Sequence, residues 1–169
     1  MASDVQWIAA AITGDPPIVL IDGRSGSGKT ELATALADVL GAQLLRLDDI
    51  YPGWDGLEAA SEQLAVILDT GRWQRWDWTS SRPADWKTLE LNRPLIVEGS
   101  GALTRASRRR ASYGIWVELD APTRKIRALD RDGALYEPNW DKWAAQEQRL
   151  FDRERPDLLA DLIVDGAAL

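Results

Sequence analysis

The sequence predicts an α/β fold in which a parallel sheet of five strands is covered by helices on both faces. Five short apolar runs follow one another along the chain, and helix-like segments lie between several of them. Such runs are typical of strands that are buried on both faces of a parallel sheet. The length of 169 residues and the apolar fraction of 45% suit a single domain over residues 1–169.

The individual elements follow from the apolar runs and from the residues that end helices. Strands are expected at Ile18–Ile21, Gln43–Leu47, Pro94–Val97, Ile115–Leu119 and Asp161–Val164. Helices are expected at residues 29–41, 56–71, 122–130 and 139–152, with a further helix in the first dozen residues. Gly41 and Gly71 stand where a helix usually ends in the left-handed conformation.

Residues 71–93 show no clear period and contain four tryptophans and Pro83. The expected structure is an irregular, tryptophan-rich insertion on the substrate side of the sheet, because binding residues often lie on loops. Flat aromatic side chains there can stack on a base or a sugar. The alternative is that they are ordinary core residues.

A glycine-rich stretch, GRSGSGKT at residues 23–30, lies between the first expected strand and the first expected helix. It fits the pattern G-x-x-x-x-G-K-[ST], whose backbone N–H groups surround phosphates while the lysine contacts the β and γ phosphates. The motif predicts a P-loop NTPase, a three-layer α/β/α sandwich that binds ATP and Mg²⁺. The residues expected to bind the nucleotide are Gly23, Ser25, Gly26, Ser27, Gly28, Lys29 and Thr30, with Thr30 also at the metal.

Acidic residues follow the second and third expected strands. Asp48 and Asp49 come after the second strand and Glu98 ends the third. Ligands of open α/β sheets bind at the carboxyl ends of the strands, so these carboxylates can accept a proton or bind Mg²⁺. The alternative for the Asp-Asp pair is a turn or a helix N-cap.

Composition narrows the chemistry and the partners. The chain has no cysteine and no histidine, so a general base must be a carboxylate or a lysine. A net charge of −7 argues against nucleic acid or an anionic membrane as partner. With no membrane-spanning run, we expect a cytoplasmic protein, monomeric or homodimeric, that acts on a small molecule.

The order of motifs resembles the uridine kinase branch of the P-loop nucleoside and nucleotide kinases, from about Ile18 to Gly166. The resemblance implies that Asp48, three residues before Tyr51, is the catalytic base and also contacts the metal. Glu98-Gly99 is similar to the family's magnesium-side Glu-Gly. The resemblance further implies substrate-binding roles for Tyr51, Trp54, Asp55, Trp76, Trp78 and Gln146.

Two departures from that family concern the acceptor. Uridine kinases carry a base-contacting histidine where this chain has Ser80-Ser81-Arg82, and the connection between Asp48 and Trp54 is shorter than theirs. The expected activity is transfer of the ATP γ-phosphate to a hydroxyl of a small molecule, first of all a nucleoside. The alternatives are a kinase of another alcohol, such as a sugar acid or an antibiotic, and an ATP-binding regulatory switch.

Three arginines, Arg124, Arg127 and Arg131, share one face of an expected helix. Arginines that arrive on a mobile segment stabilise the charge of a transferring phosphoryl group. The resemblance favours Arg127 and Arg131 as catalytic residues in a lid over residues 127–140, with Gly133 as a hinge. The alternative is a solvated basic face at the carboxyl end of the helix.

Overall fold

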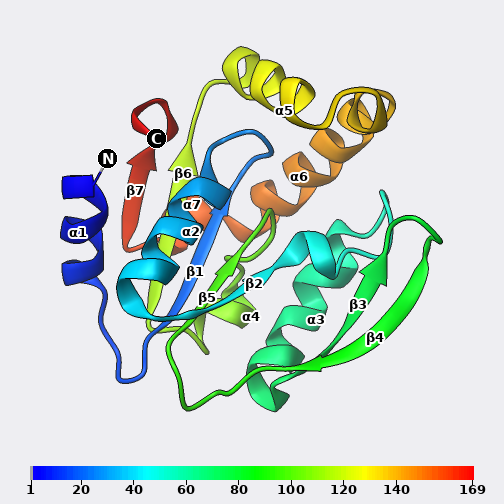
Figure 1. Cartoon of the computed structure of the whole chain (residues 1–169). Helices are drawn as coiled ribbons and strands as arrows, with labels where there is room; N and C mark the ends of the chain where they lie inside the picture. Colours follow the sequence, from blue (N-terminus) through cyan, green and yellow to red (C-terminus); the bar gives the residue numbers. More distant parts are fainter. Residues whose placement is uncertain (1) are drawn as a thin grey trace.

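A parallel sheet of five strands forms the centre of the molecule (Figure 1). The computed structural model describes residues 2–169, with side chains from residue 4 onward, and Met1 lies outside the described residues. The strands are β1 (Ile18–Gly23), β2 (Gln43–Arg46), β5 (Leu95–Glu98), β6 (Tyr113–Glu118) and β7 (Leu162–Asp165). They lie in the order β2-β5-β1-β6-β7, and all neighbours are parallel, which confirms the predicted fold class.

Helices cover both faces of this sheet, and alternate side chains of β1 point to opposite layers. Val19 and Ile21 pack with α1 (Ala2–Ala11) and α2 (Lys29–Leu40). Leu20 packs in the other layer, which contains α3 (Leu57–Thr70) and α6 (Trp140–Glu154). The short helices α4 (Arg105–Arg108) and α7 (Pro156–Leu159) lie beside α3 and β6 respectively. The three layers are therefore helix, sheet and helix.

The glycine stops predicted for the two long helices are present. Gly41 follows α2 with φ +59°, and Gly71 follows α3 with φ +68°. Their N–H groups donate to the carbonyls of Ala37 and Ile67, which closes each helix. None of the helices in the described part of the chain combines the length and the apolar character that crossing a membrane requires.

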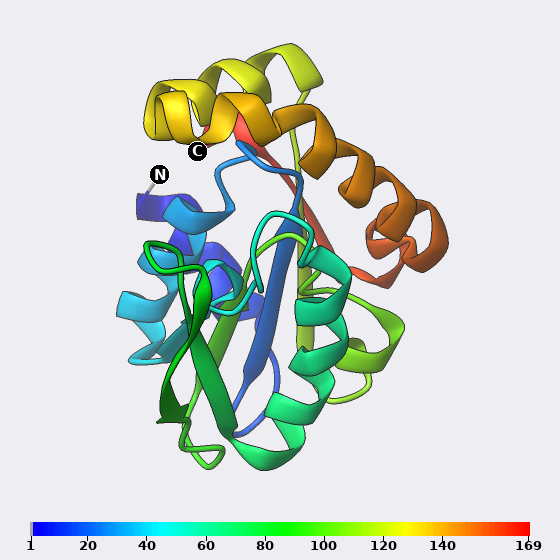
Figure 2. The same cartoon turned by 90° about the vertical axis from the view of Figure 1, so that its right-hand side faces the viewer.

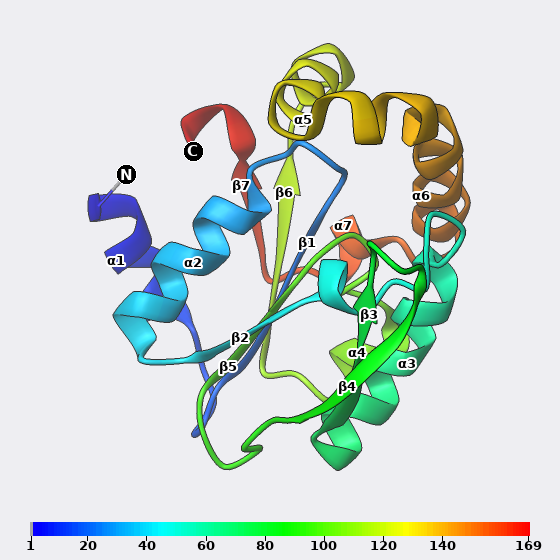
Figure 3. The same cartoon turned by 45° about the vertical axis from the view of Figure 1, so that its right-hand side comes forward.

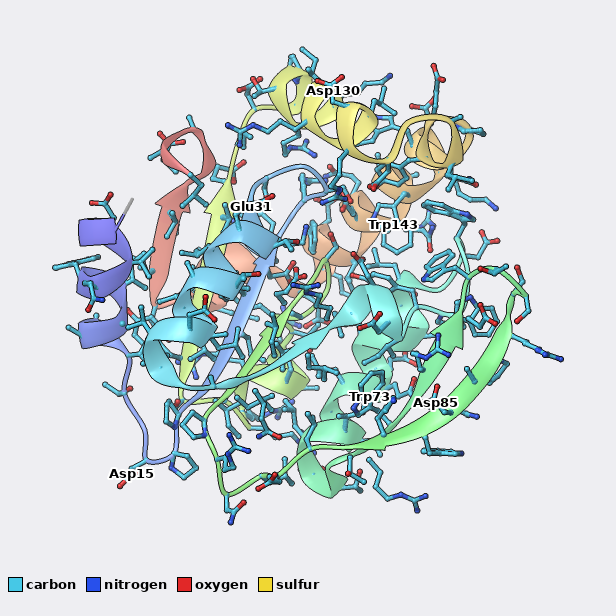
Figure 4. The ribbon with its side chains drawn as sticks, viewed as in Figure 1. Asp15, Glu31, Trp73, Asp85, Asp130 and Trp143 are labelled. Carbon is cyan, nitrogen blue, oxygen red and sulfur yellow. The ribbon has the colours of Figure 1, made fainter. Side chains whose placement is uncertain are left out.

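The prediction of an irregular insertion at 71–93 is wrong, because most of this segment is a β-hairpin. β3 (Arg72–Asp77) and β4 (Arg82–Thr88) form a separate antiparallel sheet beside α3, to its left in Figure 2. The pairing shifts register between Gln74 and Trp76, which breaks the two-residue alternation that marks a strand. Trp73 is buried in the cluster that includes α3 residues (Figure 4), and this contact anchors the hairpin.

Two helices form an arch over the carboxyl ends of the strands (Figure 3). The first, α5 (Ala121–Tyr136), is longer than predicted but has a non-helical residue inside it, Gly133, with φ +50° and ψ −130°. A short 3₁₀ helix, η2 (Glu137–Asn139), joins it to α6. Two other 3₁₀ turns, η1 (Leu47–Asp49) and η3 (Gly166–Ala168), follow β2 and β7. The predicted lid, residues 127–140, is therefore the kinked end of α5 together with η2.

Candidate active site

The glycine-rich loop lies where the motif predicted, between the end of β1 and the first residue of α2, Lys29. Gly26 and Gly28 have φ of +80° and +99°, which side chains of L residues rarely adopt. A Cβ on Gly26 would also collide with the backbone carbonyl of Arg124. Glycine is therefore required for the loop to fold tightly, with its backbone exposed for phosphate.

Two residues of the arch helices, Glu147 of α6 and Arg124 of α5, hold Ser25 in this loop. The carboxylate Oε1 of Glu147 accepts hydrogen bonds from the Ser25 N–H at 2.8 Å and from its hydroxyl at 3.0 Å. The same oxygen accepts from the Ser100 hydroxyl at 2.7 Å and from the Trp143 indole N–H at 3.1 Å. On the opposite side, Arg124 donates to the Ser25 carbonyl at 3.3 Å. The loop and the two helices of the arch are thus directly connected.

Sequence reasoning missed Glu147, and it placed Arg124 on the same helix face as Arg127 and Arg131, the arginines that it predicted to be catalytic. Glu147 is 1% exposed, and it lies four residues after Trp143, so both share one face of α6. A carboxylate on the apolar face of an expected helix is unusual, and this feature could have identified Glu147 from the sequence. Arg124 is also buried, and burial lowers its pKa from the usual value. Its contacts with Ser25 and with the Leu119 carbonyl make it a structural residue of the loop.

Asp22, the last acid before the loop, is another residue that the sequence reasoning passed over. Its fully buried carboxylate accepts hydrogen bonds from the N–H groups of Gly23 at 2.7 Å, Gly101 at 3.0 Å and Leu103 at 2.8 Å. Burial raises its pKa to about 7, although these bonds and Lys29 oppose the rise. Asp22 therefore links the start of the loop to the turn after β5.

A cavity of about 200 Å³ opens beside the loop at the carboxyl ends of β2 and β5. Most of the predicted catalytic, metal and substrate residues come together in it. Its lining comprises Ser25, Lys29, Thr30, Asp48, Tyr51, Trp54, Trp78, Glu98, Ser100, Arg131, Asp132, Tyr136 and Trp143. Asp48 lines the cavity, whereas Asp49 is absent from this set of described residues. The structure thus favours Asp48 over Asp49 independently of the resemblance.

Glu98 and Thr30 form the part of this cavity that a metal ion would use. The Thr30 hydroxyl donates to Glu98 Oε1 at 3.2 Å, and the Arg46 guanidinium lies 3.9 Å from the same oxygen. Burial raises the pKa of Glu98 above its usual value. In the described residues there is no group of three acidic, histidine or cysteine side chains that could hold a metal by itself. This fits Mg²⁺, which takes one or two protein oxygens together with phosphate oxygens and water.

Five aromatic residues form the opposite side of the cavity, and we call them the aromatic wall: Tyr51, Trp54, Trp78, Tyr136 and Trp143. Trp54 is at their centre. Its ring stacks on Tyr136 at 5.2 Å, is tilted against Trp78 at 5.1 Å and meets the edge of Trp143 at 6.2 Å. The wall brings together the loop after η1, the turn of the hairpin, the end of α5 and the start of α6; Figure 4 labels Trp143.

Four of the residues predicted to be catalytic or to bind substrate lie outside this cavity. Arg127 donates to the Gly166 carbonyl and borders a second cavity, on the other side of the loop, with Gly26 and Gly28. Asp55 is exposed and forms an ion pair with Lys142. Gln146 donates to the Trp54 carbonyl at 2.7 Å, so it supports the wall from behind. Trp76 belongs to β3, at the irregular step of the hairpin.

The five-stranded parallel sheet, with the glycine-rich loop between β1 and α2, is the arrangement of the P-loop NTPase fold. No protein-family model matches the chain, and no curated protein matches it in sequence. Solved structures do match.

A protein named as a possible uridine kinase from Bacillus stearothermophilus superimposes with a TM-score of 0.65 and 18% identity, over 96% of this chain and 98% of that one. A candidate fructose transport system kinase from Silicibacter sp. TM1040 gives a TM-score of 0.64 and 18% identity, over 96% and 97% of the two chains. Shikimate kinase from Acinetobacter baumannii in complex with shikimate gives a TM-score of 0.54 and 18% identity, over 88% of this chain and 82% of that one. The chain therefore has the P-loop kinase fold.

Proposed function

We propose that this protein is an ATP-dependent small-molecule kinase, which transfers the γ-phosphoryl group to a hydroxyl of a compact acceptor. The observation that carries the proposal is that Lys29 and Asp48 line one cavity, which the aromatic wall bounds. The loop supplies phosphate-binding N–H groups, and a carboxylate lies across from it to take a proton. The three structural neighbours described above are named as kinases of small molecules, and their names support the same class of reaction.

In the proposed reaction the acceptor oxygen forms a bond to the γ phosphorus of ATP, and the bond from that phosphorus to the oxygen of ADP breaks. Asp48 accepts the proton of the acceptor hydroxyl, so the products are ADP and a phosphate monoester. Lys29 contacts the β and γ phosphates, and Arg131 neutralises charge that develops on the transferring oxygens. Arg127, which lies at the second cavity, is placed to contact the nucleotide rather than the acceptor.

Thr30, Asp48 and Glu98 are the residues that would hold Mg²⁺, because their oxygens all line the cavity beside the loop. When bound, Mg²⁺ supplies positive charge to the phosphate oxygens. The glycine-rich loop fits the phosphates themselves, since Gly28 gives the start of α2 no side-chain cap and so leaves the N–H groups of its first turn for an anion. Both proposed cofactors, ATP and Mg²⁺, therefore suit the residues present.

Two observations favour an acceptor smaller than the nucleoside that the sequence predicted first. A cavity of about 200 Å³ is smaller than the roughly 300–1,000 Å³ of sites that enclose drug-sized ligands. Moreover, one face of Trp54 is already stacked on Tyr136, so that face is not free for a base. A nucleoside acceptor stays a prediction, and it requires the arch to open.

The test is ADP release from Mg-ATP by the purified protein over a panel of nucleosides, sugars and small alcohols, with mass detection of each product. The expected result is one or more acceptors that raise ADP release and gain one phosphate. A Lys29→Ala variant, which loses the phosphate contact, should abolish this increase and so exclude a contaminating kinase. If no acceptor raises ADP release above the rate with water, the proposed function is wrong.

A further inference from the structure

The acceptor side of the cavity differs in charge from its phosphate side. Among the lining residues that the structure describes, the only basic side chains are Lys29 and Arg131. Lys29 belongs to the phosphate loop, and the Arg131 guanidinium, which lies 2.7 Å from the Asp132 carboxylate, serves the transferring oxygens in the proposed reaction. An anionic group on the acceptor would therefore meet no cation beyond the two that the phosphates use, whereas Asp132 is left without its partner when Arg131 turns to the phosphates.

The aromatic wall offers ring surfaces more than hydrogen-bond donors, because most of its polar groups are engaged within the protein. The Trp78 indole N–H donates to the Asp48 carbonyl at 2.7 Å, and the Trp143 indole N–H donates to Glu147. The Tyr51 hydroxyl donates to the Ser100 carbonyl at 2.8 Å. With these groups engaged, the rings are what the three residues have left to offer a ligand, and the negative face of an aromatic ring attracts cations.

Asp132 provides a carboxylate at the edge of this wall. Both hydrogen bonds from Arg131 converge on its Oδ2, so Oδ1 accepts none from the described residues. Asp132 lies four residues before Tyr136, on the kinked part of α5, and both line the cavity. Aromatic rings beside a carboxylate oxygen are the arrangement by which proteins bind ammonium groups.

We propose that the acceptor is a compact alcohol that carries an ammonium group, which is held against the aromatic wall beside Asp132 while its hydroxyl lies at Asp48. This inference rests on the proposed function and adds the chemical class of the acceptor to it. Transfer then forms the bond between the alcohol oxygen and the γ phosphorus, releases ADP and passes the hydroxyl proton to Asp48. The product is a phosphate ester that keeps its ammonium group.

The test compares acceptors that differ only in charge. Choline is matched with dimethylbutanol, its uncharged carbon isostere, and glucosamine with glucose, while glycerate serves as the anionic alcohol. We expect kcat/KM to be at least about tenfold higher for each ammonium compound than for its neutral partner. The same ratio should appear in binding, measured by tryptophan fluorescence with a non-hydrolysable ATP analogue, which does not depend on transfer.

Two variants assign the preference to the proposed site. Asp132→Asn and Trp54→Leu should each lower the ratio of charged to neutral binding by at least about threefold. Trp86→Leu removes a tryptophan that is exposed on β4 and stacked by Arg72, outside the cavity, and should leave the ratio unchanged.

The outcomes separate the inference from the function it rests on. If the kcat/KM values for neutral or anionic alcohols equal those for the ammonium compounds, the inference is overturned and the kinase function stands. Charge-selective binding without any transfer would support the ammonium site and contradict the kinase. If ammonium alcohols neither bind nor react, the inference is overturned by the binding measurement alone.

Discussion

The two sides of the cavity are built in different ways. On the phosphate side, backbone groups of one continuous segment, residues 23–30, form the binding surface, and buried polar residues such as Asp22 and Glu147 hold that segment. On the acceptor side, the surface consists of side chains that come from separate parts of the chain. Trp54, Trp78 and Tyr136 meet there, although more than 80 residues separate the first from the last.

This difference explains what each side can tolerate. A backbone site depends on glycines and on the hydrogen bonds that fix the loop, so most changes there alter folding and phosphate binding together. A side-chain site can change residue by residue, with effects on the acceptor alone. The predictions below test this contrast.

Removal of the base should give the largest effect. Asp48→Asn is expected to lower turnover by about 10²–10⁴-fold, because the acceptor hydroxyl loses its proton acceptor. The affinity for ATP measured without Mg²⁺ should change little, since the loop is untouched. Asp49→Asn is the matched control: Asp49 is the adjacent residue of the same 3₁₀ turn but does not line the cavity. Steady-state kinetics with the acceptor found in the panel measures the turnover of both variants. Equal losses of turnover in the two variants would show that Asp48 is not the base.

Loss of Glu147 should show how far the loop depends on its support. Glu147→Ala leaves the Ser25 N–H and the Trp143 indole N–H without their acceptor in a buried place. We expect a decrease of about 2–3 kcal/mol in the free energy of unfolding, together with weaker ATP binding.

Glu147→Gln is the control for Glu147→Ala, because its amide oxygen can replace the carboxylate Oε1 that accepts these bonds. Urea unfolding and ATP titration should place it closer to the wild type than to the alanine variant. An alanine variant that is as stable as the wild type would show that Glu147 does not hold the loop.

Asp22 should make stability depend on pH. Its pKa is about 7 in the folded chain against 3.8 in the unfolded chain, so the folded state binds a proton more tightly. The resulting stabilisation is complete below about pH 4 and is lost as the pH rises through 7. Between pH 5 and pH 8 the wild type should lose about 2–3 kcal/mol more stability than Asp22→Asn. Chemical unfolding of both proteins at the two pH values measures this difference. An equal change in the free energy of unfolding of the two proteins would contradict the prediction.

A change on the acceptor side should have the smallest effect. Trp78→Phe keeps an aromatic ring but removes the N–H that donates to the Asp48 carbonyl. We expect the KM of the acceptor to rise about three- to tenfold, with unchanged ATP affinity and stability. Trp86→Phe, on the exposed side of the same hairpin, is the control. A loss of ATP affinity in Trp78→Phe would contradict the separation of the two sides.

The sequence predicted the position of the glycine-rich loop well, because the motif is local. Gly26, Gly28 and Lys29 form one motif with a fixed spacing, and the strand and helix beside it are regular. Asp48 and Glu98 could also be placed, since strand ends of a parallel sheet share one edge.

The residues that support the loop and those of the aromatic wall could not be predicted in the same way. Their positions depend on contacts between distant parts of the chain, which no short sequence pattern contains. Glu147 reaches Ser25 across more than 120 residues, and its carboxylate looked like an ordinary helix acid. The register shift near Gln74 hid the hairpin, and the kink at Gly133 set where Tyr136 and Asp132 lie. Tertiary packing, and not the local preference of the sequence for helix or strand, determined these positions.

The hairpin has a consequence for how this protein can diversify. In the described residues, β3 and β4 pair with each other and not with the central sheet, and the short turn between them carries Trp78 to the cavity. Residues 72–88 are joined to the rest of the described chain by their two ends, by the buried Trp73 and by the contacts of Trp78 with Asp48 and Trp54. If the proposed function holds, replacement of this hairpin by another of different sequence would change the acceptor wall and leave the glycine-rich loop as it is.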